Sequence, residues 1–276
     1  MSAISAAEVA RLRKVTGAGM MDCKKALEEA EGNFDKAIEI IRKKGQAVAN
    51  KRADRDASEG VVLSKATADG KTGMMIALNC ETDFVAKNAD FIAFACSILD
   101  KALASGSGTI EHVNALTLDG GSVASKIVEH IGVIGEKIEL SFFARIDASH
   151  VQTYIHPGNK LATMAGFNKP GINQQVYKDV AMQIAAMNPV SIDRSDVPEK
   201  VLATEMDIAR DQARREGKPE AMLEKIAEGK LNKFFKESTL LNQEFVKDNK
   251  MTIRQYLQSV DKDLTVTSFV RYTLNL

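Results

Sequence analysis

Leu78-Asn79-Cys80-Glu81-Thr82-Asp83-Phe84-Val85-Ala86-Lys87-Asn88 lies where an apolar run ends and a helical pattern begins. The run before it, residues 74–78, follows an apolar segment at residues 61–63 through an Asp69-Gly70 step, which is a strong hairpin signal. After it, apolar side chains recur at helical spacing, at Phe91, Ala95, Ile98 and Ala102. The stretch therefore joins a strand pair to a helix and predicts an α+β fold.

The same order of strand, turn, strand and helix recurs further along the chain. Residues 151–156 and 161–168 are predicted strands on either side of Pro157-Gly158-Asn159. The helix expected next has an apolar stripe at Val176, Val180, Ile184 and Met187. We infer two related sheet-plus-helix core subdomains, residues 59–137 and 138–196.

The second predicted subdomain opens with a strictly alternating segment. Its apolar positions are Ile138, Leu140, Phe142, Ala144 and Ile146, and the residues between them are mostly polar or charged. A period of two is typical of a strand with one buried face. We therefore expect these five side chains to lie on the same side of a sheet.

Residues 1–46 have the pattern of a small three-helix module. Ser5, with Glu8 three places later, is a capping box that opens the first helix. Gly32 is expected to end the second helix, and Asn33 to cap the third. Each helix has one apolar face, so the module is expected to bury a core of its own.

Gly45 is expected to end the third helix, and residues 47–58 to form a linker. The segment 42–56 is dense in charge and admits two interpretations. It is an RNA-binding surface, or it is a solvated linker or helix extension. It contains no aromatic residue that would stack on a base, which favours the second interpretation.

Residues 197–237 predict a protruding antiparallel helical hairpin. Two long helical patterns, residues 199–216 and 219–236, are separated by a Gly-Lys-Pro break, in which glycine ends one helix and proline opens the next. The alternative is that both helices pack flat on the sheets. The C-terminal segment, residues 238–276, is expected to contain a short helix near 251–258 and a final strand at 266–274 that returns to the core.

The charge balance argues against broad binding to a phosphate backbone. Lys+Arg and Asp+Glu are 37 each, so the formal net charge is zero, whereas such binding needs a basic excess. The 3 cysteines have no metal-ligand or disulfide spacing, which fits a reducing compartment. No apolar run approaches the ~20 residues that cross a bilayer. We predict a cytoplasmic protein with no direct nucleic-acid partner and no membrane partner.

The chain lacks the motifs of the common catalytic sites. It has no glycine-rich phosphate loop, no His-Glu-x-x-His and no Gly-x-Ser-x-Gly. His156 lies on a predicted turn and is more often a surface residue than a base. Cys80 follows an apolar strand and is better explained as a packed thiol than as a nucleophile. We predict that the chain is not an enzyme and has no cofactor or metal site.

The turn Thr82-Asp83-Phe84-Val85 admits two interpretations. In the first, Thr82 or Asp83 caps the next helix and Phe84 packs on the core. In the second, Phe84 is exposed for a partner, since a large apolar side chain on an exposed turn commonly has that role. Lys87 and Asn88 delay the apolar stripe, so Phe84 precedes the regular helix and is freer to project.

Two methionines at the start of the second helix raise a similar question. Met20 lies at the edge of the apolar stripe, and Met21 projects roughly opposite it, toward solvent. Methionine at such a position suits an adaptable contact surface. The alternative is that both side chains complete the small core of the module.

Two long segments resemble the signatures of one family. Leu12-Arg13-Lys14-Val15-Thr16-Gly17-Ala18-Gly19-Met20-Met21-Asp22-Cys23-Lys24-Lys25-Ala26-Leu27 resembles the amino-terminal signature of bacterial translation elongation factor Ts. Asn79-Cys80-Glu81-Thr82-Asp83-Phe84-Val85-Ala86-Lys87 resembles its second signature. The resemblance extends over essentially the whole chain. One departure is the segment 157–164, where the family usually has a glycine-rich turn; the hairpin is still expected there.

The resemblance implies a guanine-nucleotide exchange factor for elongation factor Tu. Such a factor binds the GDP form of this GTPase, displaces Mg²⁺ and promotes GDP release, so that GTP can bind during translation elongation. The residues implied to enter the GTPase are Thr82, Asp83, Phe84 and Val85. Those implied to dock the first module, which is implied to be ubiquitin-associated-like, are Leu12, Arg13, Met20 and Met21.

His156 is implied as a contact of the second subdomain with the GTPase. The helical hairpin is compatible with a homodimer or with a further contact to the GTPase. The alternative function is a non-catalytic helical adaptor that binds another protein through its N-terminal module.

Overall fold

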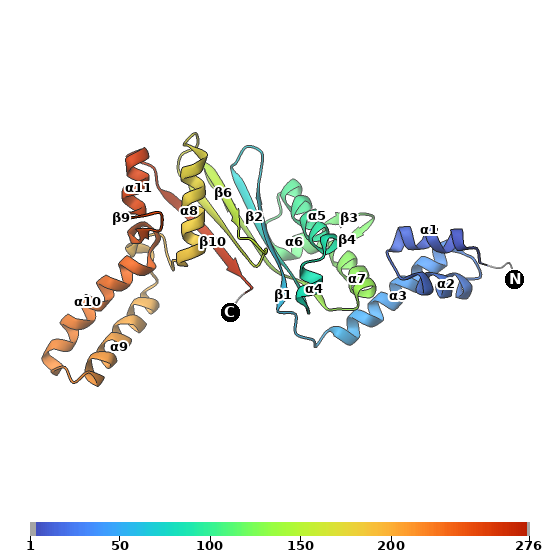
Figure 1. The fold of residues 1–276 in the computed structure, drawn as a ribbon, viewed down its shortest axis with the longest axis horizontal. Coiled ribbons are helices and arrows are strands. Elements are labelled where there is room, and N and C mark those ends of the chain that lie inside the picture. Colours follow the sequence, from blue (N-terminus) through green and yellow to red (C-terminus); the bar gives the residue numbers. More distant parts are fainter. Residues whose placement is uncertain (1–3, 275–276) are drawn as a thin grey trace.

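The computed structural model describes residues 4–274 and has four layers. Two three-stranded antiparallel sheets pack face to face, and helices cover the outer face of each sheet (Figure 1). A three-helix module at the N-terminus and a pair of long helices near the C-terminus extend from opposite ends of this body (Figure 1). The predicted α+β class is confirmed.

The first sheet has the order β1-β2-β5. Its strands are β1 (Glu59–Ala66), β2 (Thr72–Cys80) and β5 (Ile138–Asp147). The predicted β1–β2 hairpin is confirmed, and Gly70 in its turn has a φ of 67°, which a glycine adopts without strain. Since β5 pairs with β2, the first sheet crosses the subdomain boundary expected at residue 138.

The expectation of one buried face along β5 is wrong. The ladder to β2 skips Ser141, which is a β-bulge, and an extra residue exchanges the two faces of a strand. Ile138 and Leu140 therefore lie against the helices, whereas Phe142 and Ile146 lie between the two sheets.

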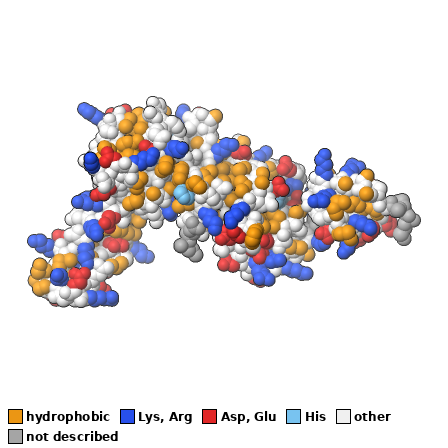
Figure 2. All heavy atoms as spheres, in the orientation of Figure 1, with side chains coloured by type: hydrophobic (Ala, Val, Ile, Leu, Met, Phe, Trp, Pro, Cys, Tyr) orange, Lys and Arg blue, Asp and Glu red, His pale blue; other side chains and the backbone are white. Residues whose placement is uncertain are grey.

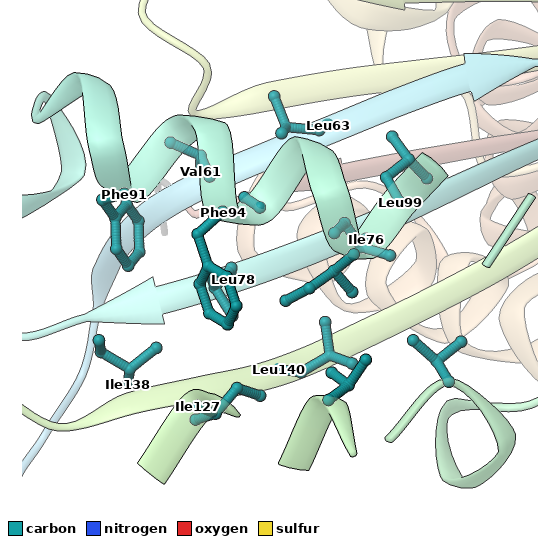
Figure 3. Close-up of a cluster of buried hydrophobic side chains, with 14 of the residues drawn as sticks. Val61, Leu63, Ile76, Leu78, Phe91, Phe94, Leu99, Ile127, Ile138 and Leu140 are labelled. Carbon is teal, nitrogen blue, oxygen red and sulfur yellow. The ribbon is translucent and has the colours of Figure 1, made fainter. Parts of the chain in front are cut away.

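The largest core cluster lies between the first sheet and its helices α5 (Ala89–Ser105) and α7 (Val123–Ile134). In Figure 3, Phe91, Phe94 and Leu99 of α5 point toward the strands. Asn88 caps α5 by accepting from the backbone N–H groups of Asp90 and Phe91. Between the two helices are three short elements that the sequence did not predict: α6 (Ile110–Ala115), β3 (Thr117–Leu118) and β4 (Gly121–Ser122).

The second sheet has the order β10-β7-β6 and is covered by α8 (Gln174–Met187). Its strands are β6 (His150–Ile155), β7 (Leu161–Phe167) and β10 (Val266–Thr273). The hairpin expected at residues 151–168 and the returning final strand are confirmed. Met187 is 42% exposed, contrary to expectation, because it is the last residue of α8.

The N-terminal module consists of α1 (Ala6–Thr16), α2 (Met20–Glu29) and α3 (Phe34–Arg52). The capping box of Ser5 and Glu8 is confirmed. The expectation that Gly45 ends the third helix is wrong, because α3 continues to Arg52. Gly45 is buried where α3 crosses Gly132 of α7, and a Cβ atom on Gly132 would lie 2.6 Å from the Gly45 Cα atom. The close helix crossing thus requires glycine at position 132, and Gly45 does not mark a helix end.

The long helices α9 (Glu199–Arg215) and α10 (Glu220–Ser238) run side by side away from the sheets (Figure 1). Ion pairs join them, including Arg210 to Glu224 at 2.9 Å and Arg214 to Glu220 at 3.1 Å. None of the helices within residues 4–274 is long and apolar enough to span a bilayer. The remaining elements are η1 (Arg194–Asp196), η2 (Leu240–Asn242), β8 (Glu244–Phe245), β9 (Asp248–Thr252) and α11 (Ile253–Val260).

Candidate partner-binding site

The turn after β2 forms a single helical turn, α4 (Asp83–Ala86). The Thr82 hydroxyl accepts from the backbone N–H of Val85 and caps it. Ala86 is buried, but Phe84 is 84% exposed. The cap is therefore present, and the interpretation in which Phe84 packs on the core is wrong.

Asp83 is paired with Lys87 on the same turn. The Lys87 ammonium donates to the carboxylate at 2.6 Å, which lowers the pKa of Asp83 and raises the pKa of Lys87. Asp83 therefore stays ionised at neutral pH. The turn presents an anionic group next to an exposed aromatic ring.

Hydrogen bonds from a distant side chain hold the residue that precedes the turn. The Glu136 carboxylate accepts from the backbone N–H of Thr82 at 3.0 Å and from its hydroxyl at 2.7 Å. Sequence reasoning missed Glu136, because nothing local relates it to a turn that lies so far away in the chain. The structure thus adds one residue to the candidate site.

Cys80 lies beneath the same turn and is fully buried. Its thiol donates to the carbonyl oxygen of Thr82 at 3.2 Å, and burial raises its pKa to about 12. A thiol in that state is a poor nucleophile at neutral pH. The interpretation of Cys80 as a packed thiol is confirmed.

The expected contact residues of the N-terminal module fall into two groups. Leu12 is fully buried in the module's core, so it has no surface to offer a partner. Arg13 is exposed, and Met20 and Met21 are 42% and 63% exposed, so the interpretation that both methionines complete the core is wrong. Val15, which was not among the expected contact residues, is 61% exposed.

A cleft of about 500 Å³ separates the N-terminal module from the core. The end of α1 lines one side with Val15 and Thr16, and α7 contributes Val133. Val85 of α4 and Phe91 of α5 also line the cleft. The exposed turn therefore borders an opening between the two parts of the chain.

His156 is exposed on the β6–β7 turn, where its Nδ1 atom lies 3.0 Å from the Tyr154 hydroxyl. The same turn contacts the first sheet, because Lys160 forms an ion pair with Glu59 at 2.8 Å. Glu59 is the partner of Cys80 in the β1–β2 ladder. The His156 turn and the 82–85 turn thus lie at the same end of the two sheets.

Metal-ligand and charge patterns among the described residues bear on the kind of site that this surface can form. Within residues 4–274, no group of three or more His, Cys, Asp or Glu side chains is placed to hold a metal ion. Basic and acidic side chains are interspersed over the face shown in Figure 2. What the described part of the chain offers is an exposed turn, an exposed module face and the cleft between them.

Comparison with known proteins decides the family. The sequence model of the Elongation factor TS family matches residues 81–275. An elongation factor Ts of Porphyromonas gingivalis is 53% identical over 274 residues, which is 99% of each chain. The chain belongs to the elongation factor Ts family. Two further members are the elongation factors Ts of Amoebophilus asiaticus, 53% identical over 98% of each chain, and of Cytophaga hutchinsonii, 50% identical over the whole of both chains.

Membership in the elongation factor Ts family assigns the general role. The chain is a guanine-nucleotide exchange factor that acts on elongation factor Tu in translation elongation, as the two signature segments imply. The family match begins at Glu81, so the 82–85 turn lies inside it, whereas the N-terminal module is matched only by the full-length relatives. A helical adaptor for some other protein is not favoured.

Proposed function

We propose that the turn Thr82-Asp83-Phe84-Val85 is the part of this exchange factor that opens the nucleotide site of elongation factor Tu. The observation that carries this proposal is the 84% exposure of Phe84 on a capped, hydrogen-bonded turn. A large aromatic side chain in that position has no packing role in its own chain. It is available to enter a partner at little cost in its own conformational entropy.

Nucleotide release follows from the electrostatics of the GTPase. Mg²⁺ and backbone amides neutralise the diphosphate, so moving them removes much of the nucleotide's binding energy. Phe84 provides an apolar wedge, and burial of an aromatic anchor is worth about 2 kcal/mol or more. Asp83 provides a carboxylate that competes for the hydrogen-bond donors and the cation around the diphosphate.

Linkage makes the process reversible. If the factor weakens nucleotide binding, the nucleotide weakens factor binding by the same ratio. The complex therefore forms on the GDP-bound GTPase, loses GDP and dissociates when GTP binds. No covalent bond is made or broken, so the factor is not an enzyme and needs no cofactor.

Two more surfaces complete the proposed interface. Arg13, Met20 and Met21 on the N-terminal module dock a separate surface of the GTPase, while Leu12 supports them from the core. His156 lies at the same end of the sheets as Phe84 and is placed to contact another part of the partner. The module, the turn and the second sheet then hold the GTPase at three places.

The finer organisation is also part of the proposal. We propose that helices α1 to α3 form a ubiquitin-associated-like module, that the segment 197–237 is a protruding hairpin, and that the two sheets belong to related subdomains. The protein acts in the cytoplasm without direct contact to nucleic acid. The hairpin is free to pair with a second copy or to contact the GTPase.

The test is the release of labelled GDP from elongation factor Tu with and without this chain. We expect the wild-type chain to accelerate release and Phe84→Ala to reduce that acceleration roughly thirtyfold, the equivalent of about 2 kcal/mol. Val246→Ala is the matched control, because Val246 is also an exposed apolar side chain, at 50%, but lies on the β8–β9 turn. Equal rates for Phe84→Ala and wild type would exclude the wedge.

A further inference from the structure

Two glutamates join the 82–85 turn to the segment before β5, because the side chain of each accepts from backbone N–H groups of the other's segment. Glu136 accepts from the backbone N–H groups of Glu81 and Thr82, at 3.2 and 3.0 Å. Glu81 in return accepts from the backbone N–H of Lys137 at 2.7 Å. We call this pair, Glu81 and Glu136, the carboxylate clasp.

The clasp stands where the β-ladder stops. Cys80 and Ile138 are the last paired residues of β2 and β5. If the pairing continued, Glu81 would lie opposite Lys137 and the chain would remain an extended strand. The clasp satisfies the N–H groups of residues 81, 82 and 137 with side-chain oxygens instead, so the chain is free to turn into α4 without leaving donors unpaired.

The clasp is built of charge-assisted hydrogen bonds in a partly covered setting, which makes it stiff. Such bonds are roughly twice as strong as neutral ones. The Glu81 side chain is 16% exposed, and Arg52 at the end of α3 offsets its charge across 3.1 Å. Glu136 also accepts from the Thr82 hydroxyl at 2.7 Å, so it holds the residue that caps α4 from both backbone and side chain.

We infer that Glu136 is a positioning residue for nucleotide exchange, which acts by holding Phe84 at a fixed angle to the sheets. This inference rests on the proposed role of the turn. Glu136 itself need not touch the GTPase. Its effect on exchange should therefore disappear when the side chain that it positions is removed.

The experiment is a double-mutant cycle on the maximal rate of GDP release at saturating concentrations of the full-length chain. Glu136→Ala should lower that rate about tenfold in the wild-type background, the loss expected when charge-assisted bonds that hold a contact are removed. In the Phe84→Ala background, the same change should lower it less than about twofold. The concentration for half-maximal rate should stay within about twofold, because the N-terminal module still docks.

Two variants separate positioning from general damage. Glu136→Gln keeps an oxygen for the two backbone N–H groups and should recover most of the rate. Glu139→Ala is the matched control, because Glu139 lies three residues after Glu136, at the start of β5, and pairs with Lys137 at 3.3 Å rather than with the turn. It should keep the wild-type rate.

The inference is overturned if Glu136→Ala keeps the wild-type rate, or if it lowers the rate by the same factor in both backgrounds. An equal loss in both backgrounds would show that Glu136 has a general structural role and does not act through Phe84. Failure of the proposed function looks different, because Phe84→Ala alone would then release GDP as fast as wild type.

Discussion

The crossing of α3 and α7 allows one prediction to be worked in atomic detail. A Cβ atom on Gly132 would lie 2.6 Å from the Gly45 Cα atom, whereas carbon atoms in contact are about 3.5–4.0 Å apart. Gly132→Ala must therefore move the two helices apart by about 1 Å. A Cβ atom on Gly45 would meet nothing closer than 3.4 Å, so Gly45→Ala is the matched control.

The two substitutions should change the free energy of unfolding in different directions. Alanine is favoured over glycine inside a helix by roughly 0.5–1 kcal/mol, so Gly45→Ala should be neutral or slightly stabilising. Overpacking of a close contact costs typically 1–3 kcal/mol, so Gly132→Ala should be destabilised by a net ~1–2 kcal/mol. At roughly 2–4 °C per kcal/mol, the melting temperature should fall by several degrees.

The displacement should also change exchange, because α3 carries the N-terminal module. Gly132→Ala should raise the concentration of factor that gives half-maximal GDP release, while the maximal rate, which depends on the 82–85 turn, stays near wild type. Thermal unfolding and a titration of labelled GDP release measure the two effects. The reasoning fails if Gly132→Ala melts and titrates like Gly45→Ala.

Three further outcomes are expected. Leu12→Ala should destabilise the fold by about 2–5 kcal/mol in denaturant unfolding, because Leu12 is fully buried. Met21→Ala should leave stability unchanged and weaken binding to elongation factor Tu. Weaker binding with unchanged stability for Leu12→Ala would instead place Leu12 in the interface. At pH 8 a maleimide should label the exposed Cys96 of the folded chain and should label Cys80, whose pKa is raised to about 12, only after the chain is unfolded. Mass spectrometry identifies the labelled cysteine, and rapid labelling of Cys80 in the folded chain would contradict its burial. Lys87→Met should raise the lowered pKa of Asp83 toward the usual carboxyl value in an NMR titration, and an unchanged pKa would refute the pairing. A carboxyl with a lowered pKa in the folded state stabilises the fold above its unfolded pKa, and this stabilisation is lost as the pH falls through the folded pKa. The variant should therefore lose this acid-sensitive contribution to stability.

Local signals in the sequence predict most of the elements. The Ser5–Glu8 capping box, the Asn33 cap and the Asp69-Gly70 turn each depend on residues a few positions apart, and the structure confirms all three. Such features can be predicted because their hydrogen bonds join near neighbours.

Predictions failed where a distant contact decides the outcome. Gly45 looked like a helix end, but α3 passes through it and packs closely against Gly132 of α7, a position that has no room for a Cβ atom. The faces of β5 exchange at Ser141 because of its pairing with β2, which alternation alone does not reveal. Tertiary packing overrides the local preference in both cases.

In the candidate site, too, the feature with a local signal could be predicted and the feature that depends on a distant contact could not. The exposure of Phe84 was one of two open interpretations, and the start of the apolar stripe at Phe91 pointed to it. Glu136 had no signal in the sequence, because its bonds to Thr82 bring together the ends of two strands, β2 and β5. Sequence reasoning located the turn but not what holds it.

The most direct test of the role of Phe84 is the maximal rate of GDP release from elongation factor Tu, measured by titrating the factor to saturation. If Phe84 drives release after docking, Phe84→Ala should lower the plateau roughly thirtyfold and change the half-maximal concentration far less. A plateau equal to wild type, with only the half-maximal concentration raised, would show that Phe84 docks the partner but does not open its nucleotide site.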